Sequence, residues 1–440
     1  MAGGTWTIQN KTRAGVYIRF TTAAPAGLTP GERGVVAICE PLSWGPIGEV
    51  NAIDSNSDLV PLTGYAYGDS HLRFLTEMFK GTNRSSGPSQ VLLYRPAATS
   101  SAKAAVTSGN LTATAQYDGT RGNDITIVII ALTGGEYTVN TVVDGVIVDS
   151  QVGTTVASLT DNAWVKFTGS GNLAATAGAA LTGGANGTVS ATGHASFLTA
   201  IEPYKFDIIA YDGTDSTTLT AYINFIKRIA DENGQYAQLV AKAASADSRF
   251  VIDVESKATL ADGTVLNENE VVWWVAGAQA GAQYNESLTF AQYPGAVACT
   301  ALTNAQYISG LAAGKFLLVS DNSVVKVESD INSLVSVSDD IGSIYKKNRI
   351  MRLCNQIAND IYAEFTNYIG AVNNDEEGRS RFKGAVVGYL LDIEAGGGIQ
   401  NFDPDDVEVL PGNAIDAILI NIAIQAVDSV EKIYMTIEVS

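Results

Sequence analysis

The chain has 440 residues, of which 46% are hydrophobic and only 17% charged, a composition typical of an ordered globular protein. Its net charge of −19 disfavours nucleic-acid binding, because phosphate contacts need clustered lysine and arginine. The longest strongly apolar run, Ile125 to Leu132, is too short to span a bilayer, and the first residues lack the pattern of a secretory signal.

The residue types that commonly carry out catalysis are few and scattered. The two histidines, His71 and His194, lie outside any H-E-x-x-H pattern, and the chain has no G-x-S-x-G motif. Cys39, Cys299 and Cys354 are too far apart for a zinc motif or a disulfide framework, and they suit a reducing cytoplasm. We therefore expect no catalytic, cofactor or metal site.

The first segment, residues 1–30, resembles an arm rather than a domain. Its alternation predicts one strand, made of Val16, Tyr17, Ile18, Arg19 and Phe20. A single strand cannot complete its own hydrogen-bonded ladder, so we expect it to pair with something else. Residues 31–96 then form the first part of a core, with strands at Val35–Ile38 and Val91–Tyr94 and a helix between Leu72 and Phe79.

Residues 97–190 are rich in alanine, threonine, glycine, valine and serine, and we expect an inserted β-sandwich or barrel there. Strands are predicted at 125–130, 137–143 and 146–148, with Asp144-Gly145 as a hairpin turn. Residues 191–340 alternate between predicted helices and strands, which predicts a largely parallel sheet covered by helices. The strands are expected at 206–211, 238–241, 250–254, 316–320 and 324–327, and the helices near 197–201, 219–229 and 303–313.

The last segment, residues 341–440, is predicted to be an α+β domain. Apolar residues from Ile344 to Tyr368 recur at helical spacing, which predicts about seven turns, and Ala417–Val427 is expected to be a strand. A second alternating strand ends the chain and consists of Ile433, Tyr434, Met435, Thr436, Ile437, Glu438 and Val439. Like the strand at 16–20, it is a candidate for donation to a neighbouring subunit.

Several motifs together resemble the contractile tail sheath proteins of bacteriophages and phage-like particles, nearest to those of prophage-type Gram-positive tails. The resemblance covers essentially the whole chain. The matching segments are Gly15–Phe20, Gly31–Val36, Leu42–Glu49, Tyr117–Ile125, Asn348–Arg352 and Ile433–Glu438.

This resemblance implies a multidomain α/β fold: a non-catalytic, subtilisin-like core, the projecting β-domain, and both terminal arms adding strands to neighbouring subunits. It implies a structural protein without cofactors that stacks as hexameric rings around an inner tail tube and contracts to drive the tube through a bacterial envelope. Its implied partners are other copies of itself, the tube protein, and baseplate and terminator proteins, with no nucleic acid and no membrane contact. Such a subunit would be assembled in the bacterial cytoplasm and located in a particle tail.

Two alternatives are open. A subtilisin-like hydrolase would need carboxylates such as Asp207, Asp212 or Asp215 beside His194, although these carboxylates also suit loops and helix caps. An exported surface-array protein would fit the low charge and the Thr/Gly/Val-rich insertion.

Charge and flexibility also bear on assembly. Residues 1–38 contain four basic residues and one acidic residue, a net charge of +3, whereas 375–440 contain four basic and thirteen acidic residues, a net charge of −9. A basic arm that meets an acidic domain would gain association rate and partner choice. Hinges are expected where the arms leave the body, at Thr21–Pro30 and Asp428–Lys432.

Overall fold

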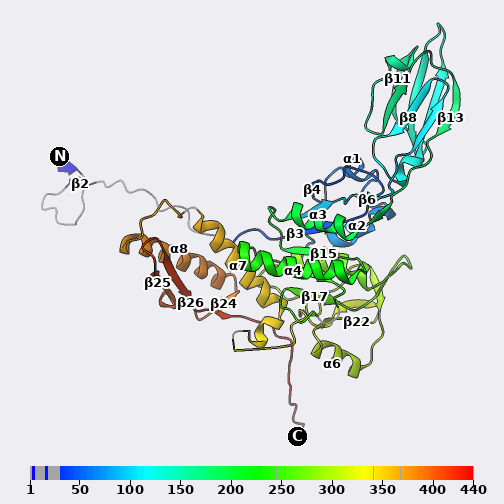
Figure 1. Cartoon of the computed structure of the whole chain (residues 1–440). Coiled ribbons are helices and arrows are strands. Elements are labelled where there is room, and N and C mark those ends of the chain that lie inside the picture. Colours follow the sequence, from blue (N-terminus) through cyan, green and yellow to red (C-terminus); the bar gives the residue numbers. More distant parts are fainter. Residues whose placement is uncertain are drawn as a thin grey trace. The chain divides into compact units, whose positions relative to one another are not determined.

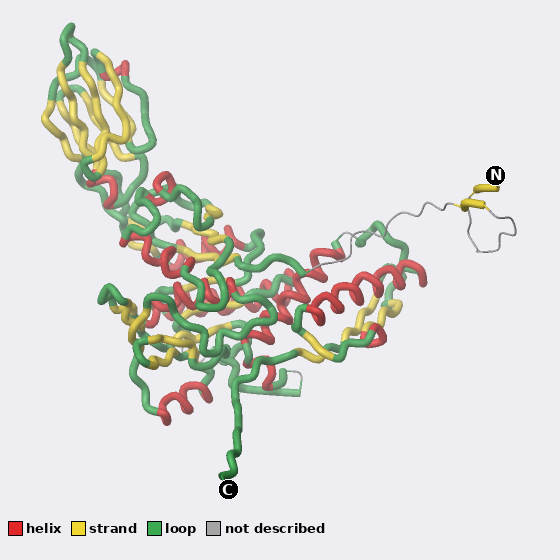
Figure 2. Tube along the Cα trace, turned by 180° about the vertical axis from the view of Figure 1, so that it is seen from behind, coloured by secondary structure: helices red, strands yellow, loops and turns green. Residues whose placement is uncertain are grey.

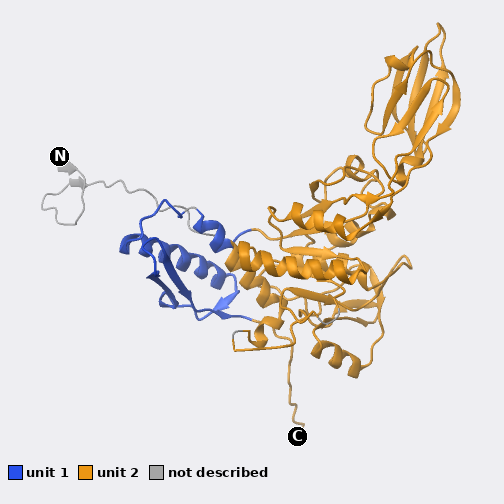
Figure 3. Cartoon of the chain, viewed as in Figure 1, with its two compact units in different colours: residues 1–31, 360–427 blue, residues 32–359, 428–440 orange. Residues whose placement is uncertain are grey.

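The structure is a computed structural model that describes residues 2–4, 15–17, 30–243, 246–339, 341–366 and 368–439. The chain forms two compact units (Figure 3). Unit 1 comprises Met1–Gly31 and Asp360–Val427, and unit 2 comprises Glu32–Asn359 and Asp428–Ser440. The chain therefore leaves unit 2 inside helix α7 (Asn348–Phe365) and returns to it at Asp428.

Unit 2 is organised around a seven-stranded sheet of strand order β21-β17-β16-β15-β3-β5-β4. All neighbouring pairs are parallel except β4 with β5. The strands are β3 (Val35–Cys39), β4 (Val50–Ile53), β5 (Gln90–Tyr94), β15 (Ile208–Tyr211), β16 (Gln238–Ala241), β17 (Val251–Val254) and β21 (Lys315–Phe316). The prediction of a largely parallel sheet is confirmed.

Helices cover both faces of this sheet, because its strands have apolar side chains on both faces. Alternate residues of β3 point to opposite faces: Val36 and Ile38 join one buried cluster, and Ala37 and Cys39 join the other. The first cluster includes α2 (Arg73–Phe79) and α5 (Glu268–Gly281), and the second includes α3 (Ala191–Ile201) and α4 (Ser216–Asn233). The helices α2 and α5 pack closely at Gly277, where a Cβ atom would lie 1.9 Å from the carbonyl oxygen of Met78.

Smaller elements complete the core of unit 2 (Figure 2). Two antiparallel sheets have the orders β19-β18-β20 and β22-β23. Their bounds, with two short helices, are β18 (Ala258–Leu260), β19 (Val265–Leu266), β20 (Ala296–Cys299), β22 (Leu318–Asp321), β23 (Val324–Val327), α1 (Val60–Thr63) and α6 (Asn304–Ala312). The strand predicted at 316–320 is thus divided between two sheets.

The β-rich segment inside unit 2 contains two facing sheets, of orders β11-β10-β9-β13 and β12-β8-β7, around one buried cluster. The predicted hairpin at Asp144-Gly145 is present, and both residues have the positive φ (52° and 80°) that such a turn needs. The strands are β7 (Ala105–Ser108), β8 (Leu111–Ala115), β9 (Ile125–Ala131), β10 (Tyr137–Val143), β11 (Val146–Gly153), β12 (Val165–Gly169) and β13 (Thr176–Ala180), with β6 (Ala98–Thr99) and β14 (Thr188–Val189) paired at its base.

Helix α7 (Asn348–Phe365) begins in unit 2 and ends in unit 1. The prediction of one helix from Ile344 was too long, because Ile344 lies in a separate 3₁₀ turn and Lys347 is extended (φ −83°, ψ 122°). The short 3₁₀ helices are η1 (Ser70–Leu72), η2 (Thr120–Asp124), η3 (Val156–Ser158), η4 (Ser343–Lys346) and η5 (Pro404–Asp406).

Unit 1 also contains α8 (Glu376–Ala395), which the sequence analysis did not predict. Its two small antiparallel pairs are β24 (Ile399–Gln400) with β27 (Gln425–Ala426), and β25 (Val407–Pro411) with β26 (Ile418–Ile422). The strand predicted at Ala417–Val427 is thus two strands with different partners. Among the described residues, no helix is both long enough and apolar enough to cross a membrane.

Candidate assembly site

The C-terminal arm (433–439) is unpaired in the single chain (Figure 1). It forms no strand within this chain, and all its apolar side chains are exposed, from 76% for Ile437 to 93% for Val439. Such a run of exposed apolar side chains marks an interaction segment. That the arm forms a strand stays a prediction, because a strand needs a partner.

The N-terminal arm (1–30) is described only in part. A three-residue strand, β2 (Gly15–Tyr17), includes two of the predicted residues, Val16 and Tyr17. It pairs in parallel with β1 (Ala2–Gly4), a partner that the sequence analysis did not anticipate. The other predicted strand residues, Ile18, Arg19 and Phe20, lie outside the described residues, as does the predicted hinge apart from Pro30.

The residue that follows the N-terminal arm, Gly31, is held within unit 1. The Gly31 N–H donates to Asp360 Oδ2 at 3.0 Å, and the hydroxyl of the fully buried Tyr389 donates to the same oxygen at 2.8 Å. Arg33 belongs to unit 2, where it forms an ion pair with Asp207 at 3.2 Å, but Glu32 belongs to unit 2 as well, so residues 1–31 keep a net charge of +3.

Unit 1 presents a hairpin with open edges, β25–β26. In the described part of the chain each of its strands has one strand neighbour, so its other edge has unpaired N–H and C=O groups. Beside β26 lies an apolar groove of about 380 Å³, lined by Ile418 and Ile420 and by the aromatic rings of Phe365, Tyr368 and Phe382. This combination can accept an added strand, with backbone bonds along the edge and side chains in the groove.

A fully buried ion pair organises the start of α7. Arg352 Nη2 lies 2.7 Å from Asp330 Oδ2, and both side chains are 1% exposed. Asp330 also accepts hydrogen bonds from Gln279 and Asn348, and Arg352 donates to the Glu286 carbonyl. Burial alone would raise the pKa of Asp330, but the adjacent guanidinium keeps it below its ordinary value. The Asn348–Arg352 motif therefore ties α7 to α5 and to the loop around Asp330.

The residues that a hydrolase would use have structural partners. Asp207 accepts hydrogen bonds from the Gly34 and Val35 amides, and Asp212 accepts one from Trp273 Nε1 at 2.8 Å. Asp215 is the N-cap of α4. His194 Nδ1 lies 3.0 Å from the Tyr222 hydroxyl, and burial lowers the pKa of this histidine.

Three aspartates whose loops could suggest calcium ligands are bound to arginines instead. Asp144 Oδ2 lies 2.6 Å from Arg121 Nη2, and Asp124 lies 3.0 Å from Nη1 of the same guanidinium. Asp118 lies 3.6 Å from Arg95. Among the residues that the structure describes, no group of histidines, cysteines or carboxylates could bind a metal ion. Burial raises the pKa of the thiols, to about 11 for Cys299.

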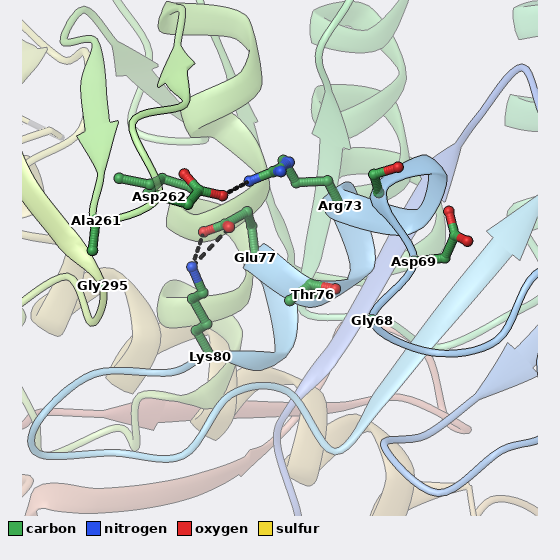
Figure 4. Close-up of a pocket in the computed structure, with 11 residues that line it drawn as sticks. Gly68, Asp69, Arg73, Thr76, Glu77, Lys80, Ala261, Asp262 and Gly295 are labelled. Carbon is green, nitrogen blue, oxygen red and sulfur yellow. Dashed lines mark hydrogen bonds and ion pairs between the residues drawn. The ribbon is translucent and has the colours of Figure 1, made fainter.

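Figure 4 shows a charged pocket of about 320 Å³ between α2 and the turn after β18. Its cations already have partners, since Arg73 binds Asp262 at 3.1 Å and Lys80 binds both oxygens of Glu77 at 2.7 and 2.8 Å. The buried Glu77 also accepts from the Tyr293 hydroxyl at 2.6 Å. The pocket is therefore a set of satisfied ion pairs rather than a phosphate-binding site.

Strand β25, half of the open hairpin, was not predicted from the sequence. Its signal was weak but present, because Val407 and Val409 alternate with Glu408, and Gly412-Asn413 follows as a turn. The strand is only five residues long, and its acidic surroundings resemble a loop.

Models of three domain families match the chain. The phage tail sheath protein β-sandwich domain matches residues 97–186, the central domain matches 187–333 and the C-terminal domain matches 340–440. These three matches span most of the chain after its first hundred residues.

Whole-length relatives agree with the domain matches. The chain is 34% identical over 473 residues to the phage-like element PBSX protein XkdK of Bacillus subtilis, with 100% of both proteins covered. It is similar to the structure of a sheath tail protein from Desulfitobacterium hafniense, with a TM-score of 0.87, 39% identity, and 96% and 99% of the two chains covered. A sheath tail protein from Listeria innocua gives a TM-score of 0.76 and 33% identity, with 92% and 94% covered.

Proposed function

Because the chain belongs to the phage tail sheath family, which is structural and not enzymatic, we propose that it is the polymerising subunit of a contractile sheath. Subunits stack as hexameric rings around an inner tail tube, and the terminal arms link them. Contraction drives the tube through a bacterial envelope. The predicted fold class, a multidomain mixture of α and β with several sheets, is confirmed.

The C-terminal arm is the observation that carries this proposal. Its four apolar residues alternate with polar or aromatic ones, so a strand would place Ile433, Met435, Ile437 and Val439 on one face. Their burial against a neighbour would contribute roughly 1.5–3 kcal/mol for each large side chain. A soluble monomer gains nothing from leaving them exposed, which supports a role in assembly.

The β25–β26 hairpin of a neighbouring copy is the proposed acceptor. An added strand would satisfy the open backbone edge of β26 and place apolar side chains in the groove beside Ile418 and Ile420. The N-terminal strand at residues 16–20 is proposed to add to a neighbour in the same way. Each donated strand remains part of its own chain while it pairs with a neighbour. The subunits therefore stay linked while the rest of each subunit moves.

Contraction needs no nucleotide in this account. A packed lattice can adopt two discrete arrangements that differ in buried contact area, and many subunits add their small individual gains. About 100–200 Å² of extra apolar burial gives each subunit a few kcal/mol. The proposed partners are further copies of this chain, the tube protein, and baseplate and terminator proteins. The proposed location is the tail of a phage or phage-like particle assembled in the bacterial cytoplasm.

The test is to substitute one apolar residue of the arm and to examine tubes by electron microscopy. We expect Ile437→Ser to abolish or strongly shorten tubes, because it removes a side chain from the face that would be buried. Thr436→Ser is the matched control, since this neighbour belongs to the opposite face of the arm. Circular dichroism should show both variants folded. Tubes of normal length from Ile437→Ser would contradict donation of this strand.

A further inference from the structure

The last residue before the C-terminal arm that makes side-chain contacts is bound at both carboxylate oxygens. Glu431 Oε1 accepts a hydrogen bond from Thr289 Oγ1 at 2.7 Å, and Glu431 Oε2 forms an ion pair with Lys347 Nζ. The Glu431 and Lys347 side chains are only 16% and 25% exposed, so water screens the pair less than at an open surface. We name Glu431, Lys347 and Thr289 the Glu431 latch.

Thr289 is itself rigidly positioned. Its hydroxyl oxygen accepts a hydrogen bond from the Asp330 N–H at 2.9 Å, and the preceding Leu288 N–H donates to Asp330 Oδ2 at 3.0 Å. The turn is closed by the Ala291 N–H, which donates to the Leu288 carbonyl at 2.8 Å. Phe290 has a φ of +60°, a conformation rare for a bulky residue, and such strain persists only where the surroundings enforce it.

Lys347 is fixed by the same buried network from the other side. It is the extended residue immediately before α7, and it forms an isolated bridge with Ile331, next to Asp330. One residue later, Asn348 donates to Asp330 Oδ1 at 2.9 Å. Both partners of Glu431 are therefore attached to the Asp330–Arg352 ion pair.

Glu431 is a bound side chain between exposed neighbours, because Val430 before it is 84% exposed and every described residue after it is exposed. Lys432 is exposed, and Ile433 is 79% exposed at the edge of a cavity of about 270 Å³ that Arg84 and Phe290 also line. Glu431 is therefore the last described side chain before the arm that is held by the body of unit 2. The open cavity leaves space for the first residues of the arm to change direction.

We propose that the Glu431 latch is the mechanical anchor of the C-terminal arm and that the arm pivots immediately after it. This inference rests on the proposed sheath function, in which the arm bears load between subunits. The anchor passes that load to the buried Asp330–Arg352 network rather than to a flexible linker. The hinge expected at Asp428–Lys432 is thereby narrowed to the residues after Glu431. Lys347 and Thr289 are positioning residues, because they hold Glu431 in place.

Trypsin cleavage at Lys432 provides the test in the full-length subunit. A protease needs several residues on both sides of the cut in an extended conformation. Glu431 must therefore separate from Lys347 and Thr289 before cleavage. We expect Lys347→Met to accelerate release of the peptide 433–440 about tenfold, equivalent to about 1.4 kcal/mol. This substitution removes one of the two partners of Glu431 without changing the sequence around the cleaved bond.

Lys346→Met is the matched control, because it makes the same change one residue away from the latch. It should leave the cleavage rate within about twofold of that of the unmodified chain. Thr289→Val, which removes the hydroxyl with little change in shape, should accelerate cleavage as Lys347→Met does. Equal cleavage rates for the unmodified chain, Lys347→Met and Thr289→Val would contradict the proposed anchoring by the Glu431 latch.

Tube formation separates this inference from the proposed function. If the Glu431 latch anchors the arm, Lys347→Met subunits should form fewer or shorter tubes than Lys346→Met subunits. Normal tubes from Lys347→Met despite fast cleavage would contradict the load-bearing role. Absence of tubes from the unmodified chain would instead count against the proposed function, while the cleavage rates would still measure the latch.

Discussion

The seven-stranded sheet and the β25–β26 hairpin illustrate two ways of using apolar residues. Every residue of β15, β16 and β17 is buried, so this sheet is complete within one chain. By contrast, no residue of β26 is fully buried, and the C-terminal arm exposes every apolar side chain. The sheet therefore buries its apolar residues within one chain, whereas the hairpin and the arm leave theirs available for the contact that we propose with a second copy.

The largest expected effect lies in the completed region. We expect Arg352→Met to lower the free energy of unfolding by about 3–5 kcal/mol, because it leaves Asp330 charged and buried without its partner. Urea unfolding would measure the loss. Arg381→Met removes the arginine of an exposed ion pair, with side chains 66% and 76% exposed, and should change stability little. Similar losses for both variants would contradict the distinction between buried and exposed pairs.

Truncating one isoleucine in each region sharpens the comparison. Ile252→Ala in β17 should cost about 2–5 kcal/mol of folding stability, because Ile252 is fully buried in the core of unit 2. Ile437→Ala should leave the unfolding free energy of the isolated subunit nearly unchanged but should impair tube formation. Thermal unfolding and electron microscopy measure the two outcomes. A clear loss of monomer stability in Ile437→Ala would mean that the arm packs against the body of its own subunit.

The buried sheet also predicts that the folding stability depends on pH. Burial raises the pKa of Asp253, at the end of β17, to about 6 from an ordinary value of 3.8. Because the folded state binds the proton more tightly, this carboxyl contributes its full stability below about pH 4 and loses it as the pH rises through 6. The loss amounts to about 3 kcal/mol.

The variant Asp253→Asn should remove that loss. The amide oxygen of the substituted side chain can still accept the hydrogen bond that Asp253 receives from the Ala243 N–H, so the folded geometry should be kept. The stability difference between variant and unmodified chain should therefore change in favour of the variant between pH 4 and pH 7. A difference that is constant with pH would mean that Asp253 keeps an ordinary pKa.

The smallest effect concerns assembly rate. The acidic C-terminal region, with a net charge of −9, should still attract the basic residues of the N-terminal arm, although Arg33 is already paired with Asp207. Polymerisation followed by light scattering should therefore slow as salt rises, because the Debye length falls from about 10 Å at 0.1 M to about 3 Å at 1 M. Rates that are flat over this range would remove electrostatic steering.

Patterns with a clear period could be predicted from the sequence. The strands at 35–38 and 91–94 and the helix before Gly234 were predicted, because elements that are buried on one or both faces have a recognisable pattern of apolar residues. Helix α8 escaped because it contains three glycines, Gly378, Gly384 and Gly388, and its apolar residues form no clear stripe. Its N-cap, Asp375, and the two glutamates that follow were the signal available.

Contacts distant in sequence could not be predicted at all. The Glu431 latch joins residues separated by 84 and 142 positions, and neither Lys347 nor Thr289 lies in a recognisable pattern. The contacts between the inserted β-domain and the rest of unit 2 are of the same kind, because Trp44 is buried against Trp164, and Arg121 of that domain donates to the Gly64 carbonyl. Such contacts depend on the folded path of the chain, which the local sequence does not specify.

A structure of the assembled tube by electron cryomicroscopy would test the central claim most directly. The account predicts residues 433–439 as a strand paired with the β25–β26 hairpin of another copy, with Glu431 still bound to Lys347 of its own chain. An arm folded onto its own subunit, or a hairpin edge left open in the tube, would contradict it.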